Sequence, residues 1–366
     1  MKTGTATFSL DTGRCPKWLF NRMKKLAGIM SEIIVEEFGA EEFLKRLANP
    51  YWFQSFGCAL AFDWNSSGLT VTTTAALKEA LRELNLGIYI CGGKGKTSKK
   101  TPEELIILSE KLNFDPNYYI KISKLTAKID NSLIQDNFNI YHHTFLLTSS
   151  GKWAVIQQGM NVNYGLARRY HWLGDRFDNK LSDITENPHS GIISEIFFKQ
   201  ILNLTAKESN SNKQGIIKIL NEEPKIEKEI YKILSEKNLN QKNNLGKNYL
   251  FLPNVEFNYH PVIEEKFDVE RIKKYILKAK FIEPKTIEDL ILIEGVGSKT
   301  IRALSLISEI IYGAKPSYQD PARYTFVNGG KDDTPYPVER AEYDKLIEIL
   351  NKAIKISKQQ KFSIFK

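Results

Sequence analysis

The amino-acid sequence predicts an α+β fold, with helices around a small, mostly antiparallel sheet, followed by an α-helical domain. Three observations lead to this prediction. Apolar residues recur at helical spacing in long segments such as 17–38 and 298–312. Residues 140–147 and 152–158 form two strand-like runs joined by the turn residues 149–151. The chain has 366 residues, a length that favours two domains.

The composition divides the chain into three parts. Residues 1–204 contain the expected sheet and most of the distinctive motifs, and we expect them to form an α+β candidate catalytic domain. Residues 205–261 are rich in Lys, Asn, Glu and Ser, which is typical of a polar helical excursion and linker. Residues 262–366 return to apolar periodicity and predict a helical domain.

Helix start and stop signals define the elements in chain order. Pro16 opens the first helix and Gly39 ends it, while Gly313 ends the helix that starts at residue 298. The expected helices are 17–38, 40–47, 74–84, 102–112, 123–135, 192–202, 269–279, 298–312 and 343–356, and a further strand covers 88–91.

Charge and cysteine content indicate the partner and the compartment. The net charge of +9 favours an anionic partner. Cys15, Cys58 and Cys91 are far apart, which indicates a reducing compartment and no zinc site. The sequence shows no secretory leader or membrane-spanning run. We therefore expect a cytoplasmic, nucleoid-associated protein with no membrane partner, and the oligomeric state stays open.

A glycine-rich basic loop follows the strand 88–91. Residues 92–100 contain three glycines, four lysines and no acid, and a helix begins directly after them. This arrangement predicts an anion cradle, although the spacing differs from that of a P-loop. Lys99 and Lys100 would contact phosphate, whereas Lys94 or Lys96 could be a reactive lysine. A solvated loop without a ligand is the alternative.

A second basic segment reads Arg168-Arg169-Tyr170-His171-Trp172. Arginine binds phosphate or a guanine edge, and aromatic rings stack on unpaired bases, so the segment suits a nucleic-acid surface. The alternative is a partly buried polar strand with arginines that reach out to solvent.

Residues 287–313 contain the strongest motif. A short helix ends at Gly295, Val296 separates two glycines, and Ser298 is expected to cap a second helix. The segment resembles the helix-hairpin-helix module of DNA repair and recombination proteins, which implies that backbone N–H groups contact a DNA phosphate. An ordinary helical hairpin is the alternative. The residues expected to contact DNA are Gly295, Gly297, Ser298, Lys299, Thr300 and Arg302 here, with Lys99, Lys100, Arg168 and Arg169.

A wider resemblance rests on motifs spread over nearly the whole chain. They are Cys15-Pro16-Lys17-Trp18-Leu19, Phe62-Asp63-Trp64 with Ser66-Ser67-Gly68, Gly92-Gly93-Lys94-Gly95-Lys96, Tyr141-His142-His143-Thr144-Phe145, Gln157-Gln158-Gly159-Met160-Asn161, Arg168-Arg169-Tyr170-His171-Trp172 and Asn187-Pro188-His189-Ser190. Together they resemble the archaeal and bacterial domain-of-unknown-function family numbered 763. The resemblance implies one functional domain in the N-terminal two-thirds but little about its chemistry.

A partial resemblance connects Lys299 and Asp320 with the helix-hairpin-helix DNA glycosylases. In that family a lysine forms a Schiff base and a later aspartate assists, at a separation close to the one here. Too few helices precede the hairpin for the usual glycosylase barrel, and Asp320 lies before Pro321. Lys299 is therefore expected to contact phosphate rather than to act as the nucleophile.

Three functions follow as hypotheses. We favour a DNA repair enzyme that acts at abasic or damaged-base sites through a lysine imine, without a cofactor; its amine must be neutral to attack. A structure-specific nuclease with Mg²⁺ or Mn²⁺ and a non-catalytic DNA-binding protein are the alternatives. The candidate catalytic residues are Lys94, Lys96, Asp63, Asp130, His142, His143 and His171. His142 and His143 should face opposite sides of their strand and so cannot share one metal.

Overall fold

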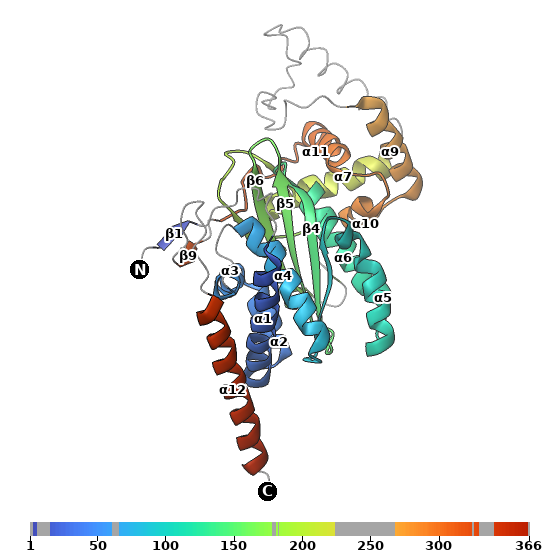
Figure 1. Ribbon diagram of the computed structural model, residues 1–366. Helices are drawn as coiled ribbons and strands as arrows, with labels where there is room; N and C mark the ends of the chain where they lie inside the picture. Colours follow the sequence, from blue (N-terminus) through green and yellow to red (C-terminus); the bar gives the residue numbers. More distant parts are fainter. Residues whose placement is uncertain are drawn as a thin grey trace.

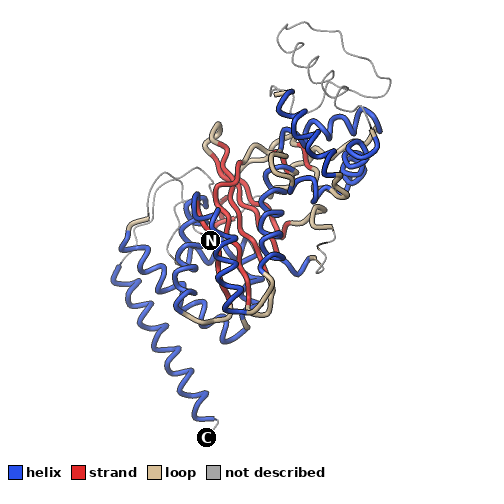
Figure 2. The backbone as a smooth tube through the Cα atoms, turned by 90° about the vertical axis from the view of Figure 1, so that its right-hand side faces the viewer, coloured by secondary structure: helices blue, strands red, loops and turns tan. Residues whose placement is uncertain are grey.

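The protein is built as an antiparallel sheet between two layers of helices, as the computed structural model shows (Figure 1). The structure describes residues 3–5, 15–60, 66–177, 181, 183–223, 268–323, 326–328 and 340–364. Seen from the side, the strands run through the centre with helices on both faces (Figure 2). The predicted combination of helices with an antiparallel sheet is therefore confirmed.

The helices fall into two groups. The first is α1 (Lys17–Phe38), α2 (Ala40–Ala48), α3 (Pro50–Ala59), α4 (Ser66–Glu83) and α12 (Arg340–Ile364). The second is α5 (Thr101–Leu112), α6 (Pro116–Ser132), α7 (Asn210–Glu222), α9 (Val269–Ile282), α10 (Ile287–Leu292) and α11 (Ser298–Tyr312). Short 3-10 turns are η1 (Gly95–Lys100), η2 (Gly174–Arg176) and η3 (Lys207–Ser209).

The main sheet has the strand order β2-β4-β5-β6-β7, and every pair in it is antiparallel. Its strands are β2 (Ile88–Lys94), β4 (Asn139–Thr148), β5 (Trp153–Asn161), β6 (Leu166–Leu173) and β7 (His189–Ser194). Two small pairs accompany it: β3 (Ile134–Gln135) with β8 (Leu202–Asn203), and β1 (Thr3–Thr5) with β9 (Phe326–Asn328).

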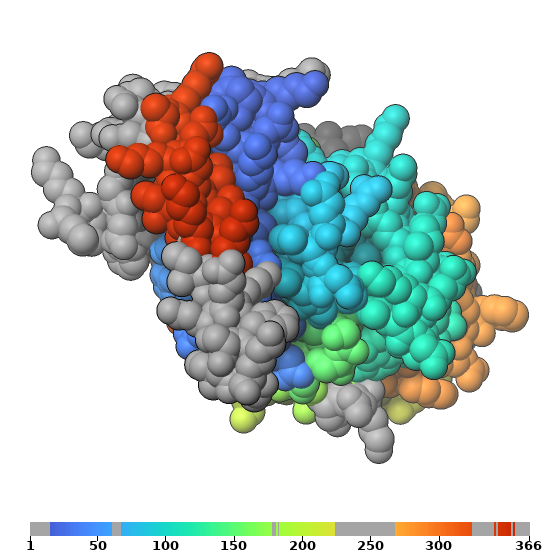
Figure 3. All heavy atoms as spheres, turned by 60° about the horizontal axis from the view of Figure 1, so that its bottom comes forward, coloured from blue at the N-terminus to red at the C-terminus, as the bar shows by residue number. Residues whose placement is uncertain are grey.

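Two hydrophobic clusters fill the spaces on the two sides of the sheet. One cluster joins α1–α4 and α12 to the sheet, and α12 lies against α1 (Figure 3). The other continues from Trp172 and Ile129 to Ile276 of α9 and Ile301 of α11. It therefore crosses the predicted boundary between the N-terminal and C-terminal domains, and both parts share one core.

Three local expectations were wrong. The predicted helix 192–202 begins instead as strand β7, which pairs with β6. Helix α4 starts at Ser66, eight residues before the expected start. Helix α7 lies inside the predicted polar helical excursion and linker 205–261, but it is not a surface helix, because its Ile216 and Ile219 are fully buried against α11. Polar residues on the exposed side of α7 hid this apolar face. The remainder of that segment, from residue 224, lies outside the described residues.

Local signals explain where the helices begin. Asn49 accepts hydrogen bonds from the amides of Tyr51 and Trp52, and Pro50 occupies the first position of α3. Thr286 and Asp289 form a reciprocal capping box at the start of α10. The residues described include no helix that is long and apolar enough to cross a membrane.

Candidate nucleic-acid interface

Residues 293–297 connect α10 to α11 and form what we call the glycine hairpin. Gly295 has φ +92°, in the region that favours glycine. An added Cβ at Gly295 would lie 1.9 Å from the Tyr275 ring of α9. This position therefore requires glycine for both conformation and space, because α9 packs directly against the hairpin.

The N-terminus of α11 is open. Gly297 is its N-cap residue, and among the described residues no side chain caps the helix. The expected cap, Ser298, is instead the first helical residue. Gly297 is part-exposed, and an added Cβ there would meet no described atom within 4 Å. The positive end of the helix dipole therefore remains accessible to an anion.

Two lysines from other helices hold the carbonyl groups of the glycine hairpin. Lys128 of α6 donates to the Val296 carbonyl at 2.9 Å, and Lys278 of α9 donates to the Glu294 carbonyl at 3.0 Å. Burial lowers the pKa of Lys128. These contacts fix the hairpin from two sides and place positive charge beside it.

The remaining predicted contacts in α11 divide between surface and core. Lys299 is exposed, whereas Thr300 and Arg302 are buried. Arg302 donates to Gln135 Oε1 at 2.6 Å, and the Gln135 amide donates to the Ser298 carbonyl at 2.9 Å. The side chains of Thr300 and Arg302 are therefore not exposed for a contact with DNA, and Arg302 positions the start of α11.

The basic loop begins at the end of the outer strand β2, where Lys94 pairs with His142, and continues as η1. Its lysines Lys94, Lys96, Lys99 and Lys100 are all exposed. The Gly92 amide, however, donates to the Glu104 carboxylate at 2.7 Å. An internal carboxylate thus occupies this part of the predicted anion cradle, and the loop offers lysine side chains rather than that amide.

Helix α6 connects the basic loop to the glycine hairpin. Gly93 lies opposite His143 in the sheet, and His143 Nε2 is 2.8 Å from Ser123 Oγ on α6. Lys128 follows Ser123 by five residues, about 7.5 Å along the helix axis. Lys121 and Lys124 are exposed and share a face of α6 with Lys128. Lysines therefore extend from the loop toward the hairpin.

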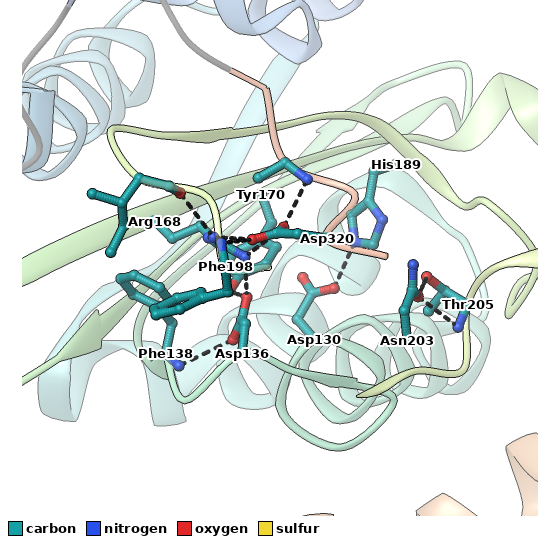
Figure 4. A network of polar contacts seen from close by, with 12 residues as sticks. Asp130, Asp136, Phe138, Arg168, Tyr170, His189, Phe198, Asn203, Thr205 and Asp320 are labelled. Carbon is teal, nitrogen blue, oxygen red and sulfur yellow. Dashed lines mark hydrogen bonds and ion pairs between the residues drawn. The ribbon is translucent and has the colours of Figure 1, made fainter. Parts of the chain in front are cut away.

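Arg168 is fully buried, so its predicted contact with DNA is wrong. Its guanidinium donates to Asp136 at 2.8 Å and to both carboxylate oxygens of Asp320, at 3.0 and 2.8 Å (Figure 4). Burial opposes the charge, but the two aspartates raise the pKa of Arg168. Asp320 also accepts from the amides of Phe198 and Ala322. Asp320 therefore has a structural role in this buried cluster, rather than the assisting role that the partial glycosylase resemblance implied.

Arg169 lies on the opposite face of the same strand and is also fully buried. It donates to Thr70 Oγ1 at 3.1 Å, to Gln54 Oε1 at 3.0 Å and to the Pro50 carbonyl at 3.4 Å. Its predicted contact with DNA is therefore wrong as well. Arg169 therefore holds α3 and α4 to β6, whereas Arg168 binds the loop residues Asp136 and Asp320 on the other face of the strand.

Asp130 brings together several residues that we call the Asp130 network. Gln157 Nε2 and Trp172 Nε1 donate to Asp130 Oδ2 at 2.6 and 3.0 Å, and His189 Nε2 lies 2.6 Å from Oδ1. Gln157 Oε1 faces His143 Nδ1 at 2.8 Å. Because that amide oxygen only accepts, His143 carries its proton on Nδ1. Asp130 is buried and accepts from three sides, so it ties α6 to the sheet.

The other two candidate histidines lie on the α4 side of the sheet. His142 Nε2 is 2.7 Å from Thr144 Oγ1, and burial lowers the His142 pKa to about 3. His171 is buried beside Phe53, and burial lowers its pKa well below the usual value. The prediction that His142 and His143 face opposite sides is confirmed. Asp130 and His143 lie on the α6 side of the sheet and His142 and His171 on the other side, so these four residues do not form one site.

Asp63 lies outside the described residues. Within the described part of the chain, no group of three or more His, Cys, Asp or Glu is arranged to hold a metal ion. Sequence reasoning missed Lys128 and Lys278 as hairpin contacts, since Lys128 lies 168 residues from Val296 in the chain. The spacing of lysines on α6 was the one available signal.

Comparison with known proteins identifies the chain at the level of the family. Searches of curated proteins and of solved structures gave no match. The family model described as "Protein of unknown function (DUF763)" matches residues 4–338, and the chain therefore belongs to this family.

Proposed function

We propose that this protein binds DNA through its phosphate backbone, without sequence preference, and that the glycine hairpin is the principal contact. The observation that carries the proposal is the open N-terminus of α11 with lysines from three helices around it: Lys128, Lys278 and Lys299. The hairpin resembles the helix-hairpin-helix module, in which such amides bind a phosphate. A backbone contact of this kind carries no sequence information.

The test is the affinity for a DNA duplex, measured by fluorescence anisotropy between about 50 and 200 mM salt. Over this range, affinity that depends on phosphate contacts falls strongly. Lys299→Glu removes a positive charge and adds a negative one at the start of α11. We expect roughly tenfold weaker binding and a shallower salt dependence. The matched control is Lys352→Glu, an exposed lysine of α12. Equal losses in both variants would leave only nonspecific attraction to net charge.

A lysine imine at abasic or damaged-base sites is the second candidate, and Lys128 favours it. Its pKa is lowered by burial, so a larger share of its amine is neutral. The neutral amine would add to the aldehyde carbon of an opened abasic sugar, and water would leave as the imine forms. This reaction needs no cofactor. Lys94 and Lys96, the lysines that the sequence suggested for this role, are exposed side chains of the basic loop.

The assay uses a duplex with one abasic site, incubated with EDTA, Mg²⁺ or Mn²⁺, with and without borohydride. Imine chemistry predicts cleavage in EDTA and a trapped adduct that Lys128→Ala removes and Lys124→Ala, an exposed neighbour on α6, retains. A trapped adduct lost in Lys94→Ala or Lys96→Ala would transfer the role to the basic loop. Cleavage that requires a metal and leaves no adduct would support a nuclease, and binding alone a non-catalytic protein.

A further inference from the structure

The last turns of α9 carry an exposed apolar patch, made of Leu277, Phe281 and Ile282. Their exposed fractions are 45%, 90% and 50%. Single exposed apolar residues are common, but a nearly fully exposed phenylalanine beside two aliphatic residues forms a continuous apolar surface. Such a surface indicates a binding partner.

The patch continues from the glycine hairpin. Tyr275 of the same helix packs against Gly295, and Lys278 donates to the Glu294 carbonyl. Phe281 follows Lys278 by three residues, so it lies one helical turn farther along a neighbouring part of the helix surface. A ligand that contacts the hairpin can therefore reach Phe281.

The charges around the patch favour a polyanion. Lys274 and Lys278 are exposed on the same side of α9 as Phe281, and Lys285 is exposed just beyond the helix. Two acids accompany these lysines: Glu283 lies 3.9 Å from Lys285, and the exposed Glu294 carboxylate lies 3.8 Å from Lys278, so Lys274 is the lysine of this face that makes no ion pair among the described residues. An aromatic ring among lysines suits a strand whose phosphates meet the lysines while a base stacks on the ring.

We propose that Phe281 stacks on a base that has lost its pairing partner, which directs the protein to flawed or single-stranded DNA. This inference rests on the proposed DNA binding by the glycine hairpin and adds the class of substrate. In an intact duplex the bases are already stacked on their neighbours, so Phe281 gains little there. At an abasic site, bulge or junction a base face is free, and the ring can cover it.

The experiment compares a fully paired duplex with the same duplex carrying an abasic site, using fluorescence anisotropy. We expect wild-type protein to prefer the abasic duplex. Phe281→Ala should bind that duplex about tenfold more weakly and the paired duplex unchanged, whereas Phe281→Trp should keep the preference. The control is Phe38→Ala, an exposed phenylalanine of α1, far from the hairpin in the chain. Thermal unfolding of each variant confirms that the fold is retained.

The outcomes separate the two proposals. If wild-type protein binds neither duplex, both fail. If it binds both, and Phe281→Ala keeps the preference or weakens both equally, only the stacking role is overturned. A 2-aminopurine opposite the abasic site adds a direct readout, since stacking by wild-type protein should quench its fluorescence and Phe281→Ala should not.

Discussion

The Arg168 cluster and the glycine hairpin use the same kinds of charged residue for opposite purposes. Around Arg168 every charge meets an internal partner, and Asp136 and Asp320 are as deeply buried as the arginine. At the hairpin, Lys128 and Lys278 donate to backbone carbonyls, and the exposed Glu294 carboxylate lies 3.8 Å from Lys278. Lys299 is exposed, and among the described residues no side chain caps the helix N-terminus. Burial and pairing, rather than residue type, therefore separate a structural charge from one that can bind a ligand.

The largest expected effect comes from breaking the buried cluster. Arg168→Met would leave Asp136 and Asp320 buried without their shared cation, and should lower the free energy of unfolding by about 3–5 kcal/mol. Urea denaturation measures this change. Arg22→Met, which breaks the surface pair with Asp344, should lower the free energy of unfolding far less, because solvent screens this pair. Similar losses in both variants would contradict the contrast.

A smaller effect is expected at the hairpin itself. Gly295→Ala would force Tyr275 away and strain the backbone, at a cost of about 2 kcal/mol. Gly313→Ala is the matched control, since that residue also has a positive φ but has open space around its Cβ position, with no described atom within 4 Å. It should cost about 1 kcal/mol, within the penalty for a left-handed residue. Duplex binding should fall in Gly295→Ala alone.

The buried histidines should make the folded protein sensitive to acid. Burial lowers the pKa values of His142, His143 and His171, so the unfolded chain binds protons below about pH 6.5 that the folded chain does not. The stabilisation from keeping these histidines neutral is therefore fully present above that pH. Below it, the free energy of unfolding falls by about 1.4 kcal/mol per pH unit for each neutral histidine. Urea midpoints at pH 7.5, 6 and 5 measure the slope. An unchanged slope in His142→Asn would rule out its share.

The smallest effect on stability is expected in the basic loop. Lys96→Ala and Lys99→Ala alter exposed side chains, so each should change the free energy of unfolding by less than about 0.5 kcal/mol. If the loop contacts phosphates, each loss should reduce the slope of log affinity against log salt by about 0.9. Titrations at several salt concentrations measure this slope. Lys352→Ala on α12 should leave this slope unaltered. If Lys352→Ala reduced the slope by the same amount, the basic loop would not be part of the DNA interface.

Periodicity and punctuation predicted much of the fold. Strand alternation placed His142 and His143 on opposite faces, and glycine spacing located the turn between α10 and α11. Both depend on interactions within a few residues. The combined motifs also predicted the family, which the match to residues 4–338 confirms.

The roles of Arg168 and Arg169 could not be predicted in the same way. Two arginines among aromatic residues suit an exposed nucleic-acid surface and a buried network equally well. The deciding partner, Asp320, is 152 residues away, and the contacts of Arg169 come from α3 and α4. Likewise, helix α7 is polar in composition, and only its contact with α11 shows why Ile216 is buried.

The ion pair between Arg168 and Asp320 also has a consequence for synthesis of the chain. Ribosomes add about 5–20 residues per second, so the 152 residues between them take about 8–30 s to appear. During that time β6 exists, but its arginine lacks one of its two carboxylates and α9–α11 have yet to cover their side of the core. During synthesis the sheet therefore lacks part of the helix layer on one side, and the apolar face left uncovered is the kind of surface that a chaperone binds.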